Sequence, residues 1–236
     1  MLNKFLPRIY NIKFWILAFF LIILISSYIY IQEIKQKIYL YSHHNNQINK
    51  LIELNSYIND FVNQKIGLVV FDDIATKINS FETILEYLID DGKINELDKS
   101  YINKLTNIQK IYSNKKLQIE RLKSSKAFAY NALTYISDNN DLGYLALNND
   151  NRKRIDFIKL KFANLSFGGD DLTQIKNEID SLQSLGIEDK YIKNFIKVSN
   201  ALLSYYSQIN LAMHRLNNID IDSNLKNVKD YLTQVM

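Results

Sequence analysis

The sequence contains no cysteine, one proline, six glycines and three histidines among its 236 residues. Without cysteine the chain cannot form a disulfide scaffold, a cysteine-based zinc site or a cysteine nucleophile. An all-β sandwich and a series of βα units both need many turns, and turns rely on proline and glycine. The shortage of these two residues therefore favours long α-helices.

Motifs that bring catalytic chemistry are also absent. The sequence has no G-x-x-x-x-G-K-[ST], G-x-G-x-x-G, G-x-S-x-G or H-E-x-x-H pattern. His43 and His44 are adjacent, so on a helix their side chains diverge by about 100° and cannot share a metal ion. The aspartate pairs at 72–73, 90–91 and 170–171 lie beside turn signals, where helix capping explains them better than acid–base chemistry. We therefore expect no enzymatic activity, no cofactor and no metal.

The charge balance is a signal of membrane topology and not of nucleic-acid binding. The formal net charge is +4, and Lys4, Arg8 and Lys13 precede the first long apolar run. Without these three, the 29 basic residues fall to 26, against 25 acidic residues. No basic cluster with interleaved aromatic residues stands out in the remainder. We therefore expect no nucleic-acid partner.

One segment is long and apolar enough to cross a membrane. Residues 14–31 read FWILAFFLIILISSYIYI and carry no charge. As a helix this segment spans about 27 Å, close to the hydrocarbon thickness of a bilayer. Trp15 at one end and Tyr28 and Tyr30 at the other suit the two membrane interfaces. A cleaved signal peptide is the alternative, but the run is long for a signal core and lacks an A-x-A-like site.

Flanking charges predict the orientation of this segment. Three basic residues precede it, whereas two, Lys35 and Lys37, follow it closely, which favours an N-terminus on the cytoplasmic side. We therefore expect residues 1–13 in the cytoplasm and 14–31 as a single, uncleaved pass through the inner (cell) membrane. Residues 33–236 then lie outside, in the periplasm where the cell has an outer membrane.

The chain beyond the membrane segment shows helical spacing nearly throughout. Apolar residues recur at intervals of three and four from Ile34 to Val69, and no glycine or proline separates this stripe from the membrane exit. One helix is therefore expected from about residue 14 to about residue 70. A second helix is expected from Asp72-Asp73 to a turn at Asp90-Asp91-Gly92. Five further helices are expected over 97–136, within 142–167, and over 172–185, 189–216 and 223–235. We expect Ser223 to cap the last of them.

The long helix through 97–136 divides the others into two halves of similar plan. Each half has too few helices to bury all of its apolar stripes, so we expect the halves to share that helix. The predicted fold is all-α, with an N-terminal transmembrane helix followed by two stacked helical-bundle lobes that share a long central helix. Lys115 and Lys126 interrupt the apolar stripe of the central helix. Buried asparagines fix helix register and exposed ones do not, and the spacing leaves both open for Asn45, Asn55 and Asn59 on the first stripe.

Two stretches resemble a known receptor family. Residues 119–135 read IERLKSSKAFAYNALTY and are similar to E-x-F-K-S-x-N-A-x-x-x-N-S-L-x-Y in the double all-helical ligand-binding (DAHL) domain of bacterial membrane receptors. Residues 59–74 read NDFVNQKIGLVVFDDI and resemble that family's first half, with Phe71-Asp72 in place of Tyr-Asp. Lys126 and Ala132 depart from the family's Asn and Ser. The matching positions in the first stretch are Glu120, Lys123, Ser124, Ala127, Asn131, Leu133 and Tyr135.

The resemblance implies a two-lobed domain over residues 33–236 that senses a small molecule. Such receptors usually continue through a second membrane helix to an output domain. The sequence up to Met236 has none, so we expect the output to be absent or supplied by a separate partner. For Asn131 and Tyr135, four apart on one helix face, we expect a paired, buried structural role ahead of a ligand contact. The candidate residues for ligand binding or lobe packing are Asn59, Asp72, Lys123, Asn131 and Tyr135.

We therefore expect a membrane-anchored extracytoplasmic sensory module that binds a small-molecule ligand. It would act as a homodimer or with a separate signalling partner. The alternative is a membrane-anchored helical scaffold or assembly factor that holds a protein partner in an apolar groove. A ligand-lined cavity favours the first function, and a long exposed apolar groove favours the second.

Overall fold

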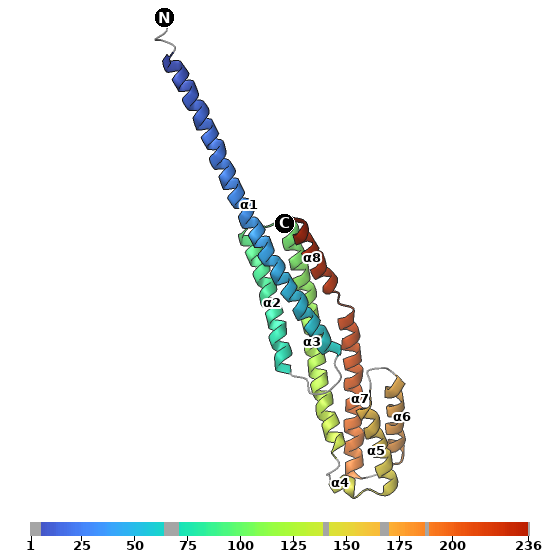
Figure 1. The fold of residues 1–236 in the computed structure, drawn as a ribbon. Helices are drawn as coiled ribbons and strands as arrows, with labels where there is room; N and C mark the ends of the chain where they lie inside the picture. The colour runs from blue at the N-terminus through green and yellow to red at the C-terminus, as the bar shows by residue number, and fades with distance from the viewer. Residues whose placement is uncertain (1–5, 64–70, 139–141, 166–169, 187–188, 236) are drawn as a thin grey trace. The chain divides into compact units, whose positions relative to one another are not determined.

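The computed structural model describes residues 6–63, 71–138, 142–165, 170–186 and 189–235. Over these residues the chain is all-helical, as predicted (Figure 1). It divides into two compact units, residues 1–50 with 226–236, and residues 51–225. The helices are α1 (Leu6–Asn63), α2 (Phe71–Ile94), α3 (Lys99–Ser137), α4 (Leu142–Leu145), α5 (Asn149–Ala163), α6 (Asp170–Ser184), α7 (Lys190–Asn217) and α8 (Asp222–Val235).

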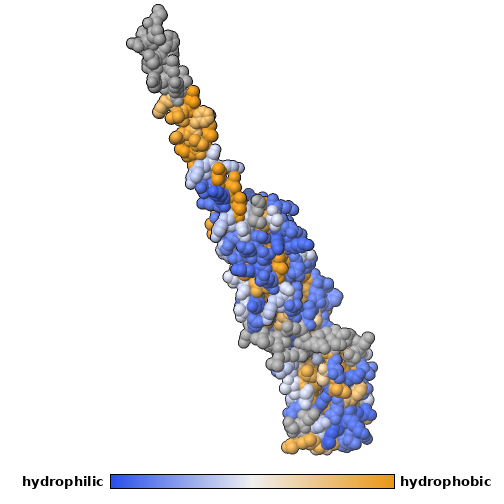
Figure 2. Space-filling model, viewed as in Figure 1, coloured by the Kyte–Doolittle hydropathy of each residue, from blue (hydrophilic) through white to orange (hydrophobic). Residues whose placement is uncertain are grey.

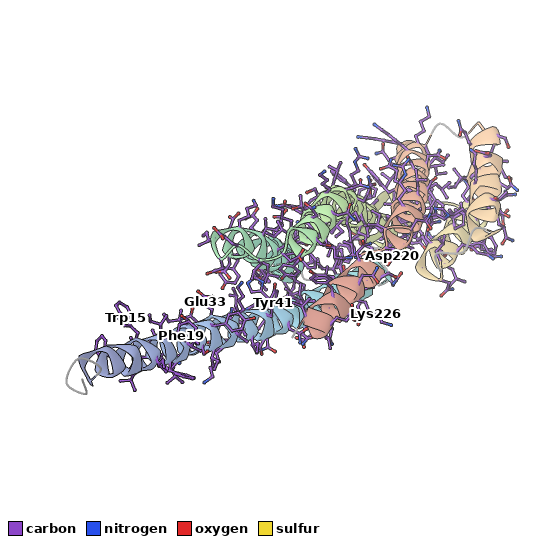
Figure 3. The ribbon with its side chains drawn as sticks, turned by 90° about the horizontal axis from the view of Figure 1, so that it is seen from above. Trp15, Phe19, Glu33, Tyr41, Asp220 and Lys226 are labelled. Carbon is purple, nitrogen blue, oxygen red and sulfur yellow. The ribbon has the colours of Figure 1, made fainter. Side chains whose placement is uncertain are left out.

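The first unit contains the apolar part of α1. All side chains of residues 14–31 except Ala18 are exposed, and Trp15 and Phe19 are 71% and 63% exposed (Figure 3). These side chains form the hydrophobic band in Figure 2. Within the part of the chain that the structure describes, α1 is the one helix long and apolar enough to cross a membrane. Its length and composition are consistent with a membrane anchor or a signal sequence.

In the second unit, α2 packs along the first half of α3. The Tyr112 ring of α3 stacks on the Phe81 ring of α2 with centroids 3.9 Å apart, and its hydroxyl donates to the Ile78 carbonyl at 3.2 Å. The Lys116 ammonium lies 2.5 Å from the Glu82 carboxylate at the edge of this contact. The inner face of α2 is formed by apolar residues that are buried at intervals of three and four: Ile74, Ile78, Phe81, Leu85 and Leu88.

The predicted turn at Asp90-Asp91-Gly92 is wrong, because α2 continues to Ile94. Gly92 remains helical, and a Cβ there would lie 3.5 Å from the Ile102 side chain of α3, an ordinary van der Waals contact. The chain turns three residues later, at Asn95 and Glu96, where Glu96 has a left-handed φ of 51°. The Leu97 amide then donates to the Gly92 carbonyl at 2.8 Å and closes the turn.

The second half of α3 packs against α7. The Phe128 ring of α3 stacks on the Tyr205 ring of α7, with centroids 5.3 Å apart. The Asp189 carboxylate begins α7 by accepting from the amides of Tyr191 and Ile192. On another side of α7, the Tyr206 ring stacks on Phe162 of α5, and α6 packs against both α5 and α7 (Figure 1).

Two helix ends show how local chemistry sets the boundaries. The helix expected over 172–185 ends close to the observed boundary, because α6 ends at Ser184 and Gly186 follows with a φ of 60°. The expected Ser223 cap of the last helix is wrong. Instead the Asp220 carboxylate accepts from the Ser223 amide at 2.9 Å, and this bond lowers the pKa of Asp220.

Candidate functional site

The second unit buries two lysines that the sequence shows as interruptions of the α3 stripe. Lys115 and Lys126 are each 1% exposed. An isolated buried charge is too costly to persist in a folded protein, so each ammonium needs hydrogen-bond acceptors. Both lysines find these acceptors on the last turns of α1.

Lys115 is the centre of a four-residue group that we call the lysine cluster. Its ammonium donates to the amide oxygens of Asn55 at 2.7 Å and Asn59 at 2.6 Å. The NH₂ groups of the same two amides donate to the Asp222 carboxylate at 2.6 and 3.2 Å. Each amide therefore turns its oxygen toward the cation and its nitrogen toward the anion, the one orientation that satisfies both. The cluster joins α1, α3 and the first residue of α8.

Burial and charge act in opposite directions on this lysine. Removal from water lowers the pKa of Lys115 to about 8, and the attraction of Asp222 partly opposes the decrease. Asn55 is fully buried, Asn59 is half-buried and Asp222 is exposed. The lysine cluster thus leads from the core to the surface and keeps a largely protonated amine at neutral pH.

Lys126 holds the end of α1 in a different way. Its ammonium donates to the carbonyls of Phe61 at 3.0 Å and Val62 at 3.2 Å, and it lies 4.9 Å from the centre of the Phe61 ring. The carbonyls in the last turn of a helix have no amide donor within the helix. An ammonium group at this end supplies the hydrogen-bond donors that these carbonyl oxygens need. Burial lowers the pKa of Lys126 to about 8.

The sequence does not reveal this site, because each lysine there is only an interruption in the apolar stripe of its own helix. The sequence does contain one indication of the site: the apolar stripe of α1 is interrupted by amides, and the apolar stripe of α3 is interrupted by amines that can bind them. The charges alone do not show which lysine of α3 lies opposite which asparagine of α1. The register between the two helices has to be known first, and it comes from tertiary packing.

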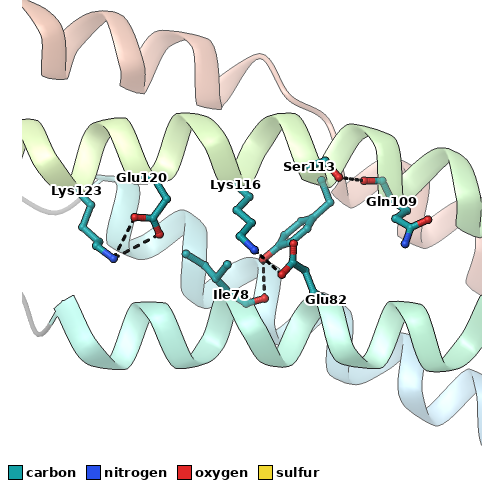
Figure 4. A network of polar contacts seen from close by, with 8 residues as sticks. Ile78, Glu82, Gln109, Ser113, Lys116, Glu120 and Lys123 are labelled. Atoms are coloured by element: carbon teal, nitrogen blue, oxygen red, sulfur yellow. Dashed lines mark hydrogen bonds and ion pairs between the residues drawn. The ribbon is translucent and has the colours of Figure 1, made fainter.

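The predicted site residues do not form one site. Asn59 belongs to the lysine cluster, whereas Lys123 pairs with Glu120 on its own helix at 3.2 Å (Figure 4). Asp72 lies in α2, but its side chain is outside the described residues. Asn131 and Tyr135 are exposed, so the expected buried, paired role is wrong for both. At their level the buried face of α3 is formed by Ala129 and Ile136.

A second candidate site is an open groove between α3 and α7, with a volume of about 470 Å³. This volume lies within the range of small-molecule sites, although those are usually more enclosed. Its lining combines exposed apolar side chains, among them Phe128 and Leu211, with the guanidinium groups of Arg121 and Arg215. Among the side chains that the structure describes, no group of three histidine, aspartate or glutamate residues gathers as a metal site.

No family model, curated protein or solved structure matches this chain. The similarity of residues 59–74 and 119–135 to the DAHL family therefore stays a prediction. Residues 64–70 of the first stretch lie outside the described residues. The case for a function rests on the lysine cluster, the α3–α7 groove and the apolar part of α1.

Proposed function

We propose that the chain is a membrane-anchored extracytoplasmic sensory module in which α1 transmits a ligand-dependent change in helix packing to the membrane. The observation that carries this proposal is the continuity of α1. One unbroken helix, Leu6–Asn63, contains both the exposed apolar segment and the turns that Lys115 and Lys126 hold. Packed helices shift between discrete arrangements, so a ligand that prefers one packing moves the whole helix.

The lysine cluster offers α1 a second register. Asn55, Asn59 and Asn63 are spaced four residues apart and form an asparagine ladder on α1. A shift of about one turn, roughly 5–6 Å toward the α1 N-terminus, brings Asn59 and Asn63 to the places that Asn55 and Asn59 hold beside Lys115. The ammonium then keeps two amide acceptors in both registers.

The shifted register is less stable without a ligand. Asn55 would move to the position of Leu51, which is fully buried, and an amide there replaces an apolar contact. A ligand must therefore bind the shifted packing more tightly to populate it. This requirement makes the proposed device a sensor and not a flexible joint.

The proposal includes two helical lobes that share α3 and an uncleaved membrane anchor at residues 14–31. The contacts of α2 with the first half of α3, and of α7 with its second half, support two lobes that share α3. The charge-free run of residues 14–31, the three basic residues before it and the lack of a cleavage site support an uncleaved anchor with the remainder outside.

A thermal-shift screen against small metabolites tests the sensory function. The full chain is placed in nanodiscs of zwitterionic lipid, and its melting temperature is measured by circular dichroism. A true ligand at 100 times its Kd stabilises the folded state by about 2.7 kcal/mol, several degrees for a domain of this size. The sensory proposal fails if no compound raises the melting temperature and no compound changes the position of α1.

The scaffold function is favoured by one observation, the open and largely apolar form of the α3–α7 groove. Grooves of this kind accept an amphipathic helix of a partner protein. A photoreactive amino acid in place of Leu211 distinguishes the two functions in cells. A scaffold gives one reproducible protein adduct of defined mass, whereas a sensory site gives none.

A further inference from the structure

We propose that the α3–α7 groove binds a small anionic amphiphile, with its acidic head between Arg121 and Arg215 and its apolar tail along Leu211, Phe128 and Tyr205. The inference names the ligand class of the sensory module proposed above and rests on that proposal for its biological role. Its physical basis is the position of the two arginines at the end of the groove opposite the stacked Phe128 and Tyr205 rings.

The two helices run antiparallel in a register that their contacts define. Phe128 stacks on Tyr205, and one turn away the Ser125 hydroxyl lies 3.4 Å from the Gln208 side-chain oxygen. Continuing in the same direction, α3 reaches Arg121 and α7 reaches Arg215. Both arginines therefore lie toward the end of the groove opposite the stacked rings.

The distance between the two ends suits a short chain or a small ring system. Arg121 and Phe128 are seven residues apart on one helix, which corresponds to about 10 Å along its axis. Leu211 and Phe128 are 52% and 56% exposed, so they offer an apolar floor to a tail of that length. The volume of about 470 Å³ accepts such a molecule.

The ionisable groups of the groove leave a net positive charge. Glu120 also lines it, but its carboxylate lies 3.2 Å from the Lys123 ammonium, which balances its charge. Neither Arg121 nor Arg215 has a hydrogen bond or an ion pair with any residue that the structure describes. A planar guanidinium binds a carboxylate through two parallel hydrogen bonds, and two such groups at one end select an anionic head.

Binding of octanoate tests the inference with a defined probe. The full chain in zwitterionic nanodiscs is dialysed against labelled octanoate, with empty nanodiscs as the blank for partition into lipid. We expect saturable binding that weakens as salt is raised, and at least tenfold weaker binding of 1-octanol and octyltrimethylammonium, which share the tail. A diazirine-bearing octanoate should crosslink to peptides within 117–128 and 205–215.

Paired variants locate the anionic head. Replacing both groove arginines (Arg121→Gln, Arg215→Gln) should reduce octanoate affinity at least tenfold. The matched control (Arg154→Gln, Lys197→Gln) removes the same charge from exposed positions outside the groove and should leave the affinity unchanged. Circular dichroism confirms that both variants remain folded.

Three results would overturn the inference: equal binding of octanol and octanoate, equal affinity of the two paired variants, or crosslinks outside the groove. Its failure is distinguishable from failure of the sensory function. If octanoate does not bind but another metabolite raises the melting temperature and moves α1, the ligand class is wrong and the sensor stands. If octanoate binds in the groove and α1 does not move, the site stands and the sensor is wrong.

Discussion

The Lys115 ammonium lies 2.7 Å from the Asn55 amide oxygen, and both side chains are excluded from water. A buried cation and a buried amide each carry a large desolvation cost, so each depends on the other. The pair therefore determines which residue of α1 lies opposite which residue of α3, as buried polar residues do in coiled coils.

A double-mutant cycle at Lys115 and Asn55 should show strong coupling. Asn55→Leu removes an acceptor of the ammonium and a donor to Asp222, and should lower the free energy of unfolding by about 1–3 kcal/mol. In a Lys115→Met background the same change should cost clearly less, with a coupling of about 0.5–3 kcal/mol. Urea unfolding of the full chain in detergent micelles measures all four corners. Additive effects of the two substitutions would mean that the contact between Lys115 and Asn55 does not contribute to stability.

The stability of the domain should rise with pH above about 8. The pKa of Lys115 and of Lys126 is lowered to about 8 in the folded protein, below the ordinary value of 10.5. Between these values the unfolded chain binds more protons than the folded chain, so the free energy of unfolding increases with pH. By a pH of about 9.5, each lysine should have added about 2 kcal/mol to the free energy of unfolding. The experiment stops at this pH because the tyrosines of the unfolded chain titrate above it.

The control for this pH dependence is the double variant Lys115→Met, Lys126→Met. It should give a much flatter profile in unfolding experiments over the same range, because it removes the two buried lysines whose pKa is lowered to about 8. A rise that persists in the double variant would assign the effect to other groups.

Asn63 should be needed for the shift of α1 and not for stability. Its side chain is exposed, and its amide donates to the Asn59 backbone carbonyl at 3.0 Å. Asn63→Ala should change the melting temperature by no more than about 2 °C. The same variant should lose the ligand-dependent movement of α1, because Lys115 then lacks its second acceptor in the shifted register. A variant that moves like the natural sequence would exclude the asparagine ladder.

Asn131 and Tyr135 should tolerate substitution. Both are exposed, so Asn131→Ala and Tyr135→Phe should alter the free energy of unfolding by less than about 0.5 kcal/mol. The neighbouring Ile136 is 1% exposed, and Ile136→Ala should cost about 2–5 kcal/mol as a matched control. A large loss at Asn131 would restore the structural role that the sequence predicts.

The C-terminal end should face the outside of the cell. An alkaline phosphatase fused at Met236 should be active in intact cells, and a reporter that works only in the cytoplasm should be silent there. An N-terminal epitope tag should remain on the chain, because we expect the apolar segment to stay uncleaved. Loss of the tag would assign that segment to a signal sequence.

Periodicity predicted the helices well because local burial patterns repeat every three to four residues. It gave α3 nearly to its ends and the stop of α6 at Gly186. It failed where a tertiary contact decides the outcome. The helix α2 continues past the Asp90-Asp91-Gly92 turn signal to Ile94, and the partner Asn55 of Lys115 lies 60 residues away in the sequence, on another helix. The exposure of Asn131 likewise depends on which face of α3 meets its neighbours.

The position of α1 beside α3, with and without ligand, tests the central claim most directly. Since the chain has no cysteine, spin labels at Asp60→Cys and Asn103→Cys report one distance without background. Asp60 lies near the Lys115 level, and Asn103 lies 12 residues before Lys115 on α3. The last turns of α1 run parallel to α3, because Lys115 contacts Asn59 and Lys126, further along α3, contacts Phe61 and Val62. A saturating hit from the thermal-shift screen should shorten this distance by about 5 Å, the rise of one helical turn. An unchanged distance distribution, with a ligand that raises the melting temperature, would contradict the proposed sensor.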